Sequence, residues 1–511
     1  WTLLEALLMD RRFNLVDEPW IPVVYADGSS TRVGWRGLLG DSARIVDIPT
    51  DPTHLYGMVI RFATAIFLRT QGAPLVSPRP ADWQAWGASR LDAGIDGSTL
   101  DAYFEQWGDR FWLIDRTHPF LQDPTIATEC TKPASTNKLF FEVASGNNHL
   151  WWTKTPDKSA DEVPFDIAAM ALLGQWGYAA GGRCTARAGI ADSKQAPERA
   201  FSQFIPRGQT LFETLLMCCT PAVLDASLAE KDVPVWEADP GAVLVPGQLG
   251  RLTASTRGLL AFSEGDGVTG AINTWSRGEV GDEFWTSDVF MAKKLVGREK
   301  EIAPLKFGPS SAIWRNAPAI LANNPDAGAQ MSPMVLDPAR NPLGATEVFF
   351  RSGVSVVSHF ADKSKDLGWG RSELPEVLAA GPSRDAEAFE RLGQFCLLAG
   401  EVLNKVAFVV VSKRGPKAGR QVPVITDGEM FVGDLQHDAE SVFYAVLHGM
   451  AWEDGARQLL DVCLERFDAA TERVGAPEQL AATIQRRRQL GWQLRKITEQ
   501  FGLNNTSEVV A

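Results

Sequence analysis

A change of pattern near His437 is the feature of this sequence that most limits what the chain can fold into. Before it, short apolar runs typical of strands alternate with helical segments. After it, apolar residues recur three and four positions apart, as in Val442–Met450 and Ala456–Ala470. We therefore predict an α+β fold, with a large mixed α/β domain over residues 1–436 followed by a C-terminal helical bundle over residues 437–511.

Several segments before His437 have a pattern clear enough to predict their type. Leu55–Leu68 carries apolar residues at helical spacing, and it is predicted to be a buried helix. Strand patterns occur in Phe13–Val23, Val348–Arg351 and Val354–Val357. Between these strands and the C-terminal bundle, Ala386–Asn404 is predicted to be a further helix.

The charge and cysteine content limit the possible partners and compartment. The chain has 50 Lys and Arg against 63 Asp and Glu, a net charge of −13, and this bulk acidity argues against a general binder of nucleic acid. Apolar runs stay far below the ~18 residues of a membrane span, and the first ten residues resemble an amphipathic helix rather than a secretion signal. Six cysteines without a C-x-x-C pattern are expected to be reduced and mostly buried, which predicts a cytoplasmic protein (Cys130, Cys184, Cys218, Cys219, Cys396 and Cys463).

No catalytic pattern is evident. The six histidines show no H-x-x-x-H or H-E-x-x-H spacing, and the sequence has no P-loop, nucleophile elbow or dinucleotide fingerprint. We therefore predict no catalytic residues, no metal and no cofactor. Two alternatives stay open: a stand-alone metal-dependent hydrolase or nuclease with an unrecognised carboxylate site, and a structural scaffold.

One segment concentrates positive charge in this acidic chain. No acidic residue occurs from Val402 to Thr426, and the cations gather between Lys405 and Arg420. Strand patterns at Val406–Ser412 and Gln421–Ile425 predict a hairpin with a basic tip. It is either a solvated hairpin whose lysines protect a strand edge, or a finger that contacts a phosphate backbone.

A second segment combines glycines with cations. Gly181 and Gly182 follow the predicted helix Ile167–Trp176, and Arg183, Arg187 and Lys194 come shortly after. Adjacent glycines allow a close approach of the backbone to another surface, such as a nucleic-acid groove. The alternative is an ordinary helix C-cap.

Three strings add a resemblance to these patterns. They are FNLVDEPWIPV at Phe13–Val23, DRFWL followed by HPFLQ within Asp109–Gln122, and LTASTRGLL at Leu252–Leu260. In order and spacing, over about Phe13–Phe431, they resemble the CasA family, the large subunit of the type I-E CRISPR Cascade surveillance complex.

The resemblance implies a non-catalytic subunit. Such a protein recognises the protospacer-adjacent motif (PAM) of double-stranded DNA through the minor groove and helps open the duplex, so that guide RNA can pair with one strand. It then recruits a helicase–nuclease. The implied partners are target DNA, guide RNA, other Cascade subunits and that helicase–nuclease, with no membrane.

The resemblance also assigns roles to residues. The family's glycine loop, which lies along the minor groove, corresponds to Ala179, Ala180, Gly181 and Gly182. Its wedge, a hairpin tip that inserts beside the last base pair of the motif and splits the next one, corresponds to Gly415, Pro416, Lys417, Ala418 and Gly419. A loop that contacts guide RNA and neighbouring subunits corresponds to Trp151, Trp152, Lys154 and Lys158, and a contact to flanking DNA falls near Arg351.

Two points of the resemblance are incomplete. A family lysine that reads the motif has no counterpart here, and the clustered metal-binding cysteines of some members are missing. The family ends in a four-helix bundle that touches small subunits. The region after His437 is short for four helices, so we expect it to be truncated, incompletely represented or completed by Ala386–Asn404.

Overall fold

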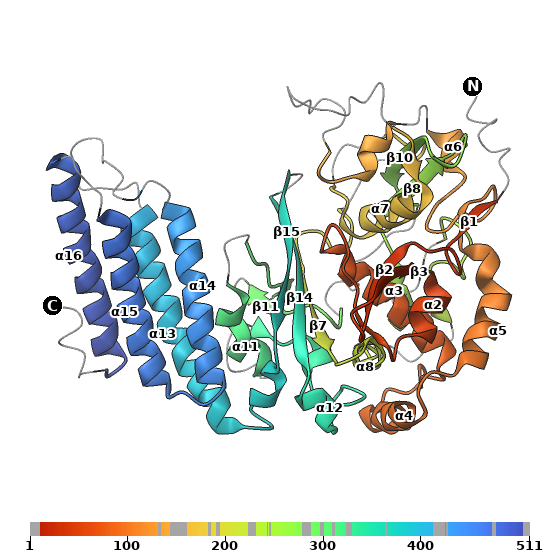
Figure 1. Ribbon diagram of the computed structural model, residues 1–511. Helices are drawn as coiled ribbons and strands as arrows, with labels where there is room; N and C mark the ends of the chain where they lie inside the picture. The colour runs from red at the N-terminus through yellow and green to blue at the C-terminus, as the bar shows by residue number, and fades with distance from the viewer. Residues whose placement is uncertain are drawn as a thin grey trace. The chain divides into compact units, whose positions relative to one another are not determined.

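The computed structural model of the chain separates into two compact units. The first unit comprises residues 1–309 and 324–378, and the second comprises residues 310–323 and 379–511 (Figure 1). The structure describes residues 11–130, 134–143, 161–181, 185–190, 195–222, 231–242, 244, 247–277, 288–296, 301–308, 312–322, 330–362, 365–411, 425, 428–472 and 477–503.

A buried helix forms the centre of the first unit. This helix, α3 (Leu55–Thr70), is buried at every position except Arg69, which confirms the helix predicted over Leu55–Leu68. It packs against the helices α2 (Trp35–Gly40), α5 (Gly97–Trp107), α7 (Phe165–Tyr178), α8 (Leu211–Cys218) and α9 (Gln248–Thr253). The other helical elements of this unit include α4 (Pro80–Ala93), α6 (Ile126–Glu129), α12 (Glu347–Phe350), η1 (Gly108–Arg110), η2 (Thr136–Leu139) and η6 (Met334–Leu336).

The described strands of the first unit form small antiparallel sheets. In one, β2 (Ile21–Tyr25) lies between β3 (Ser30–Val33) and β4 (Ile45–Asp47). In another, β14 (Gly353–Asp362) lies between β7 (Ser202–Arg207) and β15 (Lys365–Leu374). The others pair β1 (Arg12–Asn14) with β5 (Trp112–Ile114), β8 (Arg257–Phe262) with β10 (Gly270–Trp275), β6 (Val163–Pro164) with β9 (Gly267–Val268), and β11 (Lys293–Val296) with β12 (Glu301–Pro304) and β13 (Gln330–Met331).

Residues of the strings that carry the resemblance form hydrogen bonds inside the core of this unit. The segment predicted as one strand over Phe13–Val23 is instead β1, a turn and β2, because the Trp20 indole folds back and donates to the Leu15 carbonyl at 3.1 Å. The buried Gln122 side chain joins β5 to β8, since it donates to the Leu113 carbonyl at 2.7 Å and accepts from the Ala261 N–H at 2.6 Å.

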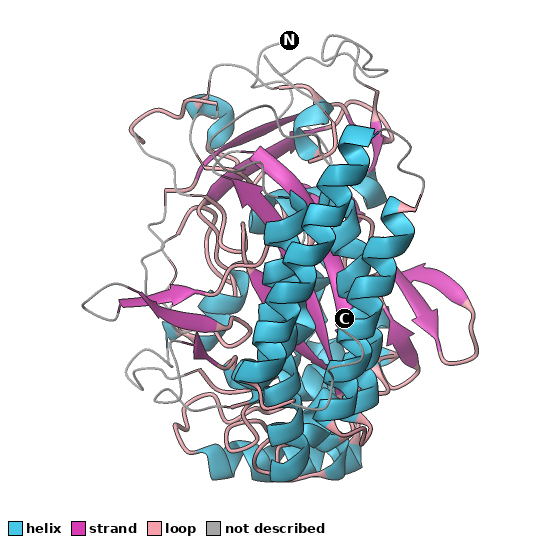
Figure 2. Cartoon of the chain, turned by 90° about the vertical axis from the view of Figure 1, so that its left-hand side faces the viewer, coloured by secondary structure: helices cyan, strands magenta, loops and turns pink. Residues whose placement is uncertain are grey.

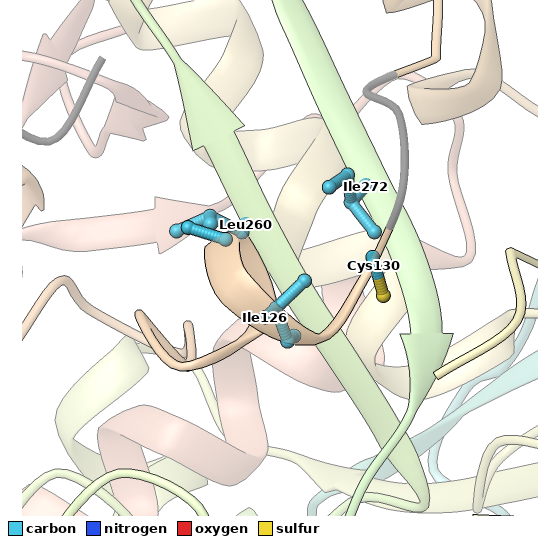
Figure 3. Packing of buried hydrophobic residues seen from close by; sticks show 5 residues of the cluster. Ile126, Cys130, Leu260 and Ile272 are labelled. Carbon is cyan, nitrogen blue, oxygen red and sulfur yellow. The ribbon is translucent and has the colours of Figure 1, made fainter. Parts of the chain in front are cut away.

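Apolar side chains pack α6 and the residue after it against β8 and β10. Ile126 and Cys130 meet Leu260 of β8 and Ile272 of β10 in one buried cluster (Figure 3). Among the described cysteines, all five are free and buried, as expected for a reduced protein.

The second unit is helical throughout its described residues. Its long helices α13 (Ala386–Val411), α14 (Gly428–Leu447), α15 (Trp452–Thr471) and α16 (Pro477–Gln500) lie side by side (Figures 1 and 2). The short elements η5 (Ile313–Asn316) and α11 (Ala317–Leu321) pack against α13. The predicted C-terminal helical bundle is confirmed, and α13 completes it. The compact unit therefore begins earlier than the predicted boundary at residues 436 and 437, since it also includes residues 310–323 and 379–436.

Two strand predictions are wrong. Val348–Arg351 overlaps α12, whose first turn is capped by the Thr346 hydroxyl. Val406–Val411 belongs to α13, where Val402, Val406 and Val409 continue one buried stripe at helical spacing. A run of valines favours a strand locally. Here the segment is helical because the helix buries that stripe against α14, α15 and α16.

Among the described residues, one helix is long and apolar enough to cross a membrane, judged by length and composition alone. It is α13 over Ala386–Val410, and 44% of its most apolar window is buried inside the structure. The core helix of a bundle has the same composition, and α13 contacts all three of its long neighbours.

Candidate nucleic-acid interface

The loop that follows α7 is held by two segments of the first unit. Ser255 and Arg257, from the LTASTRGLL string, reach this loop from one segment. The Ser255 hydroxyl donates to the Trp176 carbonyl at 2.6 Å, and Arg257 Nη1 donates to the Ala180 carbonyl at 3.2 Å. Arg257 is buried, and it also donates from Nε and Nη2 to Asn273 Oδ1 at 3.1 and 2.6 Å.

The second segment is residues 195–201. Its Glu198 N–H donates to the Gly177 carbonyl at 2.8 Å, and its Ala196 N–H donates to the Ala179 carbonyl at 2.9 Å. Arg199 Nη1 donates to the Tyr178 carbonyl at 3.0 Å. Five consecutive carbonyl groups, from Trp176 to Ala180, therefore each have their own donor, so the end of α7 and the start of the loop are rigidly mounted.

A glycine is required at position 181 because the backbone of Gln195 lies close to it, and not because the residue caps a helix. The C-cap of α7 is Ala179, in an extended conformation, so Gly181 lies two residues beyond it. A Cβ atom on Gly181 would lie 2.9 Å from the backbone nitrogen of Gln195, closer than side chains tolerate. Gly182, Arg183 and Lys194 lie outside the described residues.

Arg187 does not supply positive charge to this loop. Its side chain is fully buried and pairs with Asp123 and Glu129, both at 2.6 Å, and it donates to the Trp275 carbonyl at 2.9 Å. The proximity of Arg187 in sequence suggested a cation at the surface, but two carboxylates neutralise it inside the fold.

The structure contains a long hairpin that the sequence pattern predicted only in part. Strand Val354–Val357 is confirmed as the start of β14, whereas β15 was missed. β7 pairs with β14 only over Gly353–Ser358, so the outer halves of β14 and β15 extend beyond β7 as a two-stranded ribbon (Figure 1). The signal available in the sequence was the turn-forming run Asp362-Lys363-Ser364-Lys365 between two extended segments.

The hairpin predicted for the wedge does not begin as a strand. The residues assigned to it, Gly415–Gly419, lie outside the described residues, and the segment before them is the end of α13. At the tip of the β14–β15 ribbon, residues 363 and 364 are outside the described residues, and the neighbouring Lys365 is exposed.

Ionic contacts fix the outer half of the β14–β15 ribbon to residues 195–201. Asp366 Oδ1 lies 2.6 Å from Arg199 Nη1 and 3.0 Å from His359 Nε2. Burial works to raise the pKa of Asp366, but His359 and Arg199 outweigh it and hold that pKa below its usual value, so the carboxylate stays charged.

Aromatic rings form a second connection at the same place. The His54 ring is fully buried and lies 4.5 Å from the ring of Tyr178, 5.2 Å from that of Trp369 and 5.3 Å from that of His359, centroid to centroid. Burial holds the pKa of His54 well below its ordinary value. His54 is therefore neutral and packs as an aromatic ring between α7 and the ribbon.

The remaining predicted positions contribute less. Arg351 is half-exposed and pairs with Glu213 at 2.8 Å, so part of its charge is already compensated. Trp151, Trp152, Lys154 and Lys158 lie outside the described residues. Within the described part of the chain, no group of three His, Cys, Asp or Glu side chains is arranged to hold a metal ion.

Comparison with known proteins gives one consistent family. The sequence profile of the family "CRISPR-associated protein Cse1" matches residues 14–474. The chain is 28% identical over 426 residues to CRISPR-associated protein CasA/Cse1 of Thermus thermophilus, covering 80% of each chain. The fold is similar to Thermobifida fusca Cse1 (TM-score 0.75, 16% identity, 96% of this chain and 98% of that one). It is also similar to a chain of a CRISPR RNA-guided surveillance complex (TM-score 0.77, 23% identity, 94% of this chain and 100% of that one).

Proposed function

This chain belongs to the Cse1 family of CRISPR-associated proteins, the CasA proteins of type I-E systems, and from that membership we propose that it is the large, non-catalytic subunit of an RNA-guided surveillance complex. The proposal is supported by the profile match over residues 14–474 and by the similarity of fold to a chain of such a complex. Its partners are then the other Cascade subunits and a guide RNA, in the cytoplasm.

Within that complex, the subunit recognises the PAM of double-stranded DNA from the minor groove. The observation that carries this proposal is the mounting of Ala179–Gly181. Five consecutive carbonyls are fixed from inside, and the loop lacks bulky side chains, so a thin, rigid backbone edge is available to a narrow groove. A rigid edge selects by groove shape, because it cannot adjust to a groove of another width.

Opening of the duplex requires an element that enters beside the motif. We favour the β14–β15 ribbon over Gly415–Gly419 for this role, because it extends beyond β7 and carries the exposed Lys365 near its tip. Unstacking a base step costs about a few kcal/mol, which pairing with guide RNA and contacts to the phosphates offset. Guide RNA and neighbouring subunits are contacted by the loop residues Trp151, Trp152, Lys154 and Lys158. Arg351 contacts flanking DNA, and the DNA-bound complex recruits the helicase–nuclease.

The test uses the assembled complex with its guide RNA. Binding of duplexes that differ only in the PAM is measured at several salt concentrations, and strand opening is followed by a fluorescent base analogue at the first guide-paired position. We expect motif-dependent binding whose logarithm falls linearly with the logarithm of salt concentration. Lys365→Ala slows opening, whereas Lys417→Ala leaves it unchanged.

Other outcomes identify which part of the proposal fails. Loss of opening in Lys417→Ala alone returns the wedge role to Gly415–Gly419. Binding that ignores the PAM removes the motif-reading role altogether. Degradation of nucleic acid by the isolated protein with Mg²⁺ or Mn²⁺ favours the alternative of a metal-dependent nuclease.

A further inference from the structure

We propose that Arg199 is a positioning residue that fixes the β14–β15 ribbon relative to the loop Ala179–Gly181, so that reading of the motif and opening of the duplex act as one step. The inference rests on the proposed function of these two elements and goes beyond it, because it assigns a role to a buried residue that touches no DNA.

The contacts of Arg199 join the two elements directly. Its Nη1 donates to the carbonyl of Tyr178, the residue just before the loop, at 3.0 Å, and lies 2.6 Å from Asp366 Oδ1 on β15. One guanidinium nitrogen therefore touches both the ribbon and the last residue of α7, from which the loop starts. The Arg199 side chain is fully buried, whereas the carboxylate of Asp366 is about a quarter exposed (27%).

The backbone beside Arg199 is shaped for the same contact. Ala200 has a φ of +61°, a conformation that residues with a side chain rarely adopt. In this conformation its N–H donates to Nδ1 of His359 on β14 at 3.4 Å, and His359 Nε2 lies 3.0 Å from Asp366. Both strands of the ribbon are therefore attached to residues 199 and 200.

This attachment lies beyond the part of the ribbon that pairs with β7. β7 pairs with β14 only as far as Ser358, and His359 and Asp366 are in the part that continues beyond it. The Arg199 contact is therefore the ionic part of what holds the outer half of the ribbon relative to the loop, next to the ring packing around His54. If the loop settles in the groove of a correct motif, the outer half of the ribbon is held at a fixed distance beside the next base pair.

Two variants separate the contacts. Arg199→Gln removes the charge that both elements share, and Asp366→Asn breaks the ion pair to the ribbon while keeping the bond to the Tyr178 carbonyl. The matched control is Arg187→Gln, because Arg187 is an equally buried arginine with two carboxylate partners and one carbonyl partner, yet it contacts neither the loop nor the ribbon.

The assembled complex is tested on two duplexes with the same PAM, one fully paired and one with its first guide-complementary base pairs already unpaired. We expect both variants to open the paired duplex about tenfold more slowly, within the range usual for coupled sites, and to bind the pre-opened duplex at the wild-type rate. Arg187→Gln leaves two buried carboxylates without their partner, so it should affect both duplexes alike and leave the ratio of the two rates at the wild-type value. A general loss of stability slows both duplexes, so the difference between them isolates the positioning role.

The proposal is overturned if Arg199→Gln and Asp366→Asn give the same ratio of the two rates as Arg187→Gln, either because both duplexes are affected equally or because neither is affected. If the Arg199→Gln subunit does not assemble into the complex, the Asp366→Asn variant tests the proposal alone, because its partly exposed side chain keeps its volume. A wild-type complex that opens duplexes with and without the PAM equally contradicts the proposed function itself, and not only this inference.

Discussion

Substitution of Gly181 by alanine tests whether the close approach of the loop to residue 195 matters for DNA binding. The new Cβ would lie 2.9 Å from the Gln195 nitrogen, which is 0.5 Å short of the 3.4 Å at which ordinary contact begins. Gln195 cannot simply retreat, because its carbonyl accepts from the Thr256 hydroxyl at 3.0 Å and the next N–H is bonded to the Ala179 carbonyl. The loop must move outward instead.

The size of the effect follows from that displacement. A shift of 0.5 Å lengthens the bond between the Ala196 N–H and the Ala179 carbonyl from 2.9 Å to about 3.4 Å, beyond the normal range. Overpacking of this kind costs about 1–3 kcal/mol. The free protein relieves the strain by letting the loop move, but a DNA groove does not allow this, so the cost appears as roughly 5- to 150-fold weaker binding.

The assay is equilibrium binding of a PAM-containing duplex by the assembled complex. The control is Gly433→Ala on α14, where no atom lies within 4 Å of the new Cβ, and which should leave binding unchanged and stabilise the helix by about 1 kcal/mol. Binding by Gly181→Ala within twofold of the wild type would refute the reasoning.

Three further predictions concern other parts of the chain. Burial raises the pKa of Glu198 from 4.5 to about 8 despite the attraction of Arg61. Between these pH values the folded protein holds a proton that the unfolded chain has released, so the free energy of unfolding falls as pH rises from 4.5 to 8. Thermal melting of Glu198→Gln should show a flatter dependence on pH. Arg351→Ala should weaken binding equally for all motifs and reduce the salt slope by about 1, and an unchanged slope would remove Arg351 from the DNA contact. Leu494→Ala, at a fully buried position of α16, should cost about 2–5 kcal/mol in denaturant unfolding of the helical unit; a loss below 1 kcal/mol would contradict its place in the core.

Much of the architecture was predictable because it depends on local periodicity. The buried helix α3 and the C-terminal helices follow from the spacing of apolar residues, which is the same in any context that buries one face. The three family strings were predictable markers for a related reason. Residues such as Gln122 and Ser255 bond to backbone groups far away in the sequence, and few other residue types provide those bonds.

The candidate site was less predictable, because it depends on what surrounds each residue. Arg187 and Arg199 have the same chemistry and lie twelve positions apart, yet one neutralises an internal acidic pair and the other joins the loop to the ribbon. Similarly, Val406–Val411 is rich in strand-forming residues, but the packing of α13 against three helices makes it helical.

By itself, the sequence determined the fold class, the helical end of the chain and the loop after α7, since these depend on spacing and on residues that are adjacent in the chain. Only the tertiary structure decided which arginines pair with carboxylates inside the protein and which hairpin extends beyond its sheet. The reason is physical: the free energy of a charge or a strand depends on burial and on partners from distant segments, as with Asp366 and Arg199, which are 167 positions apart.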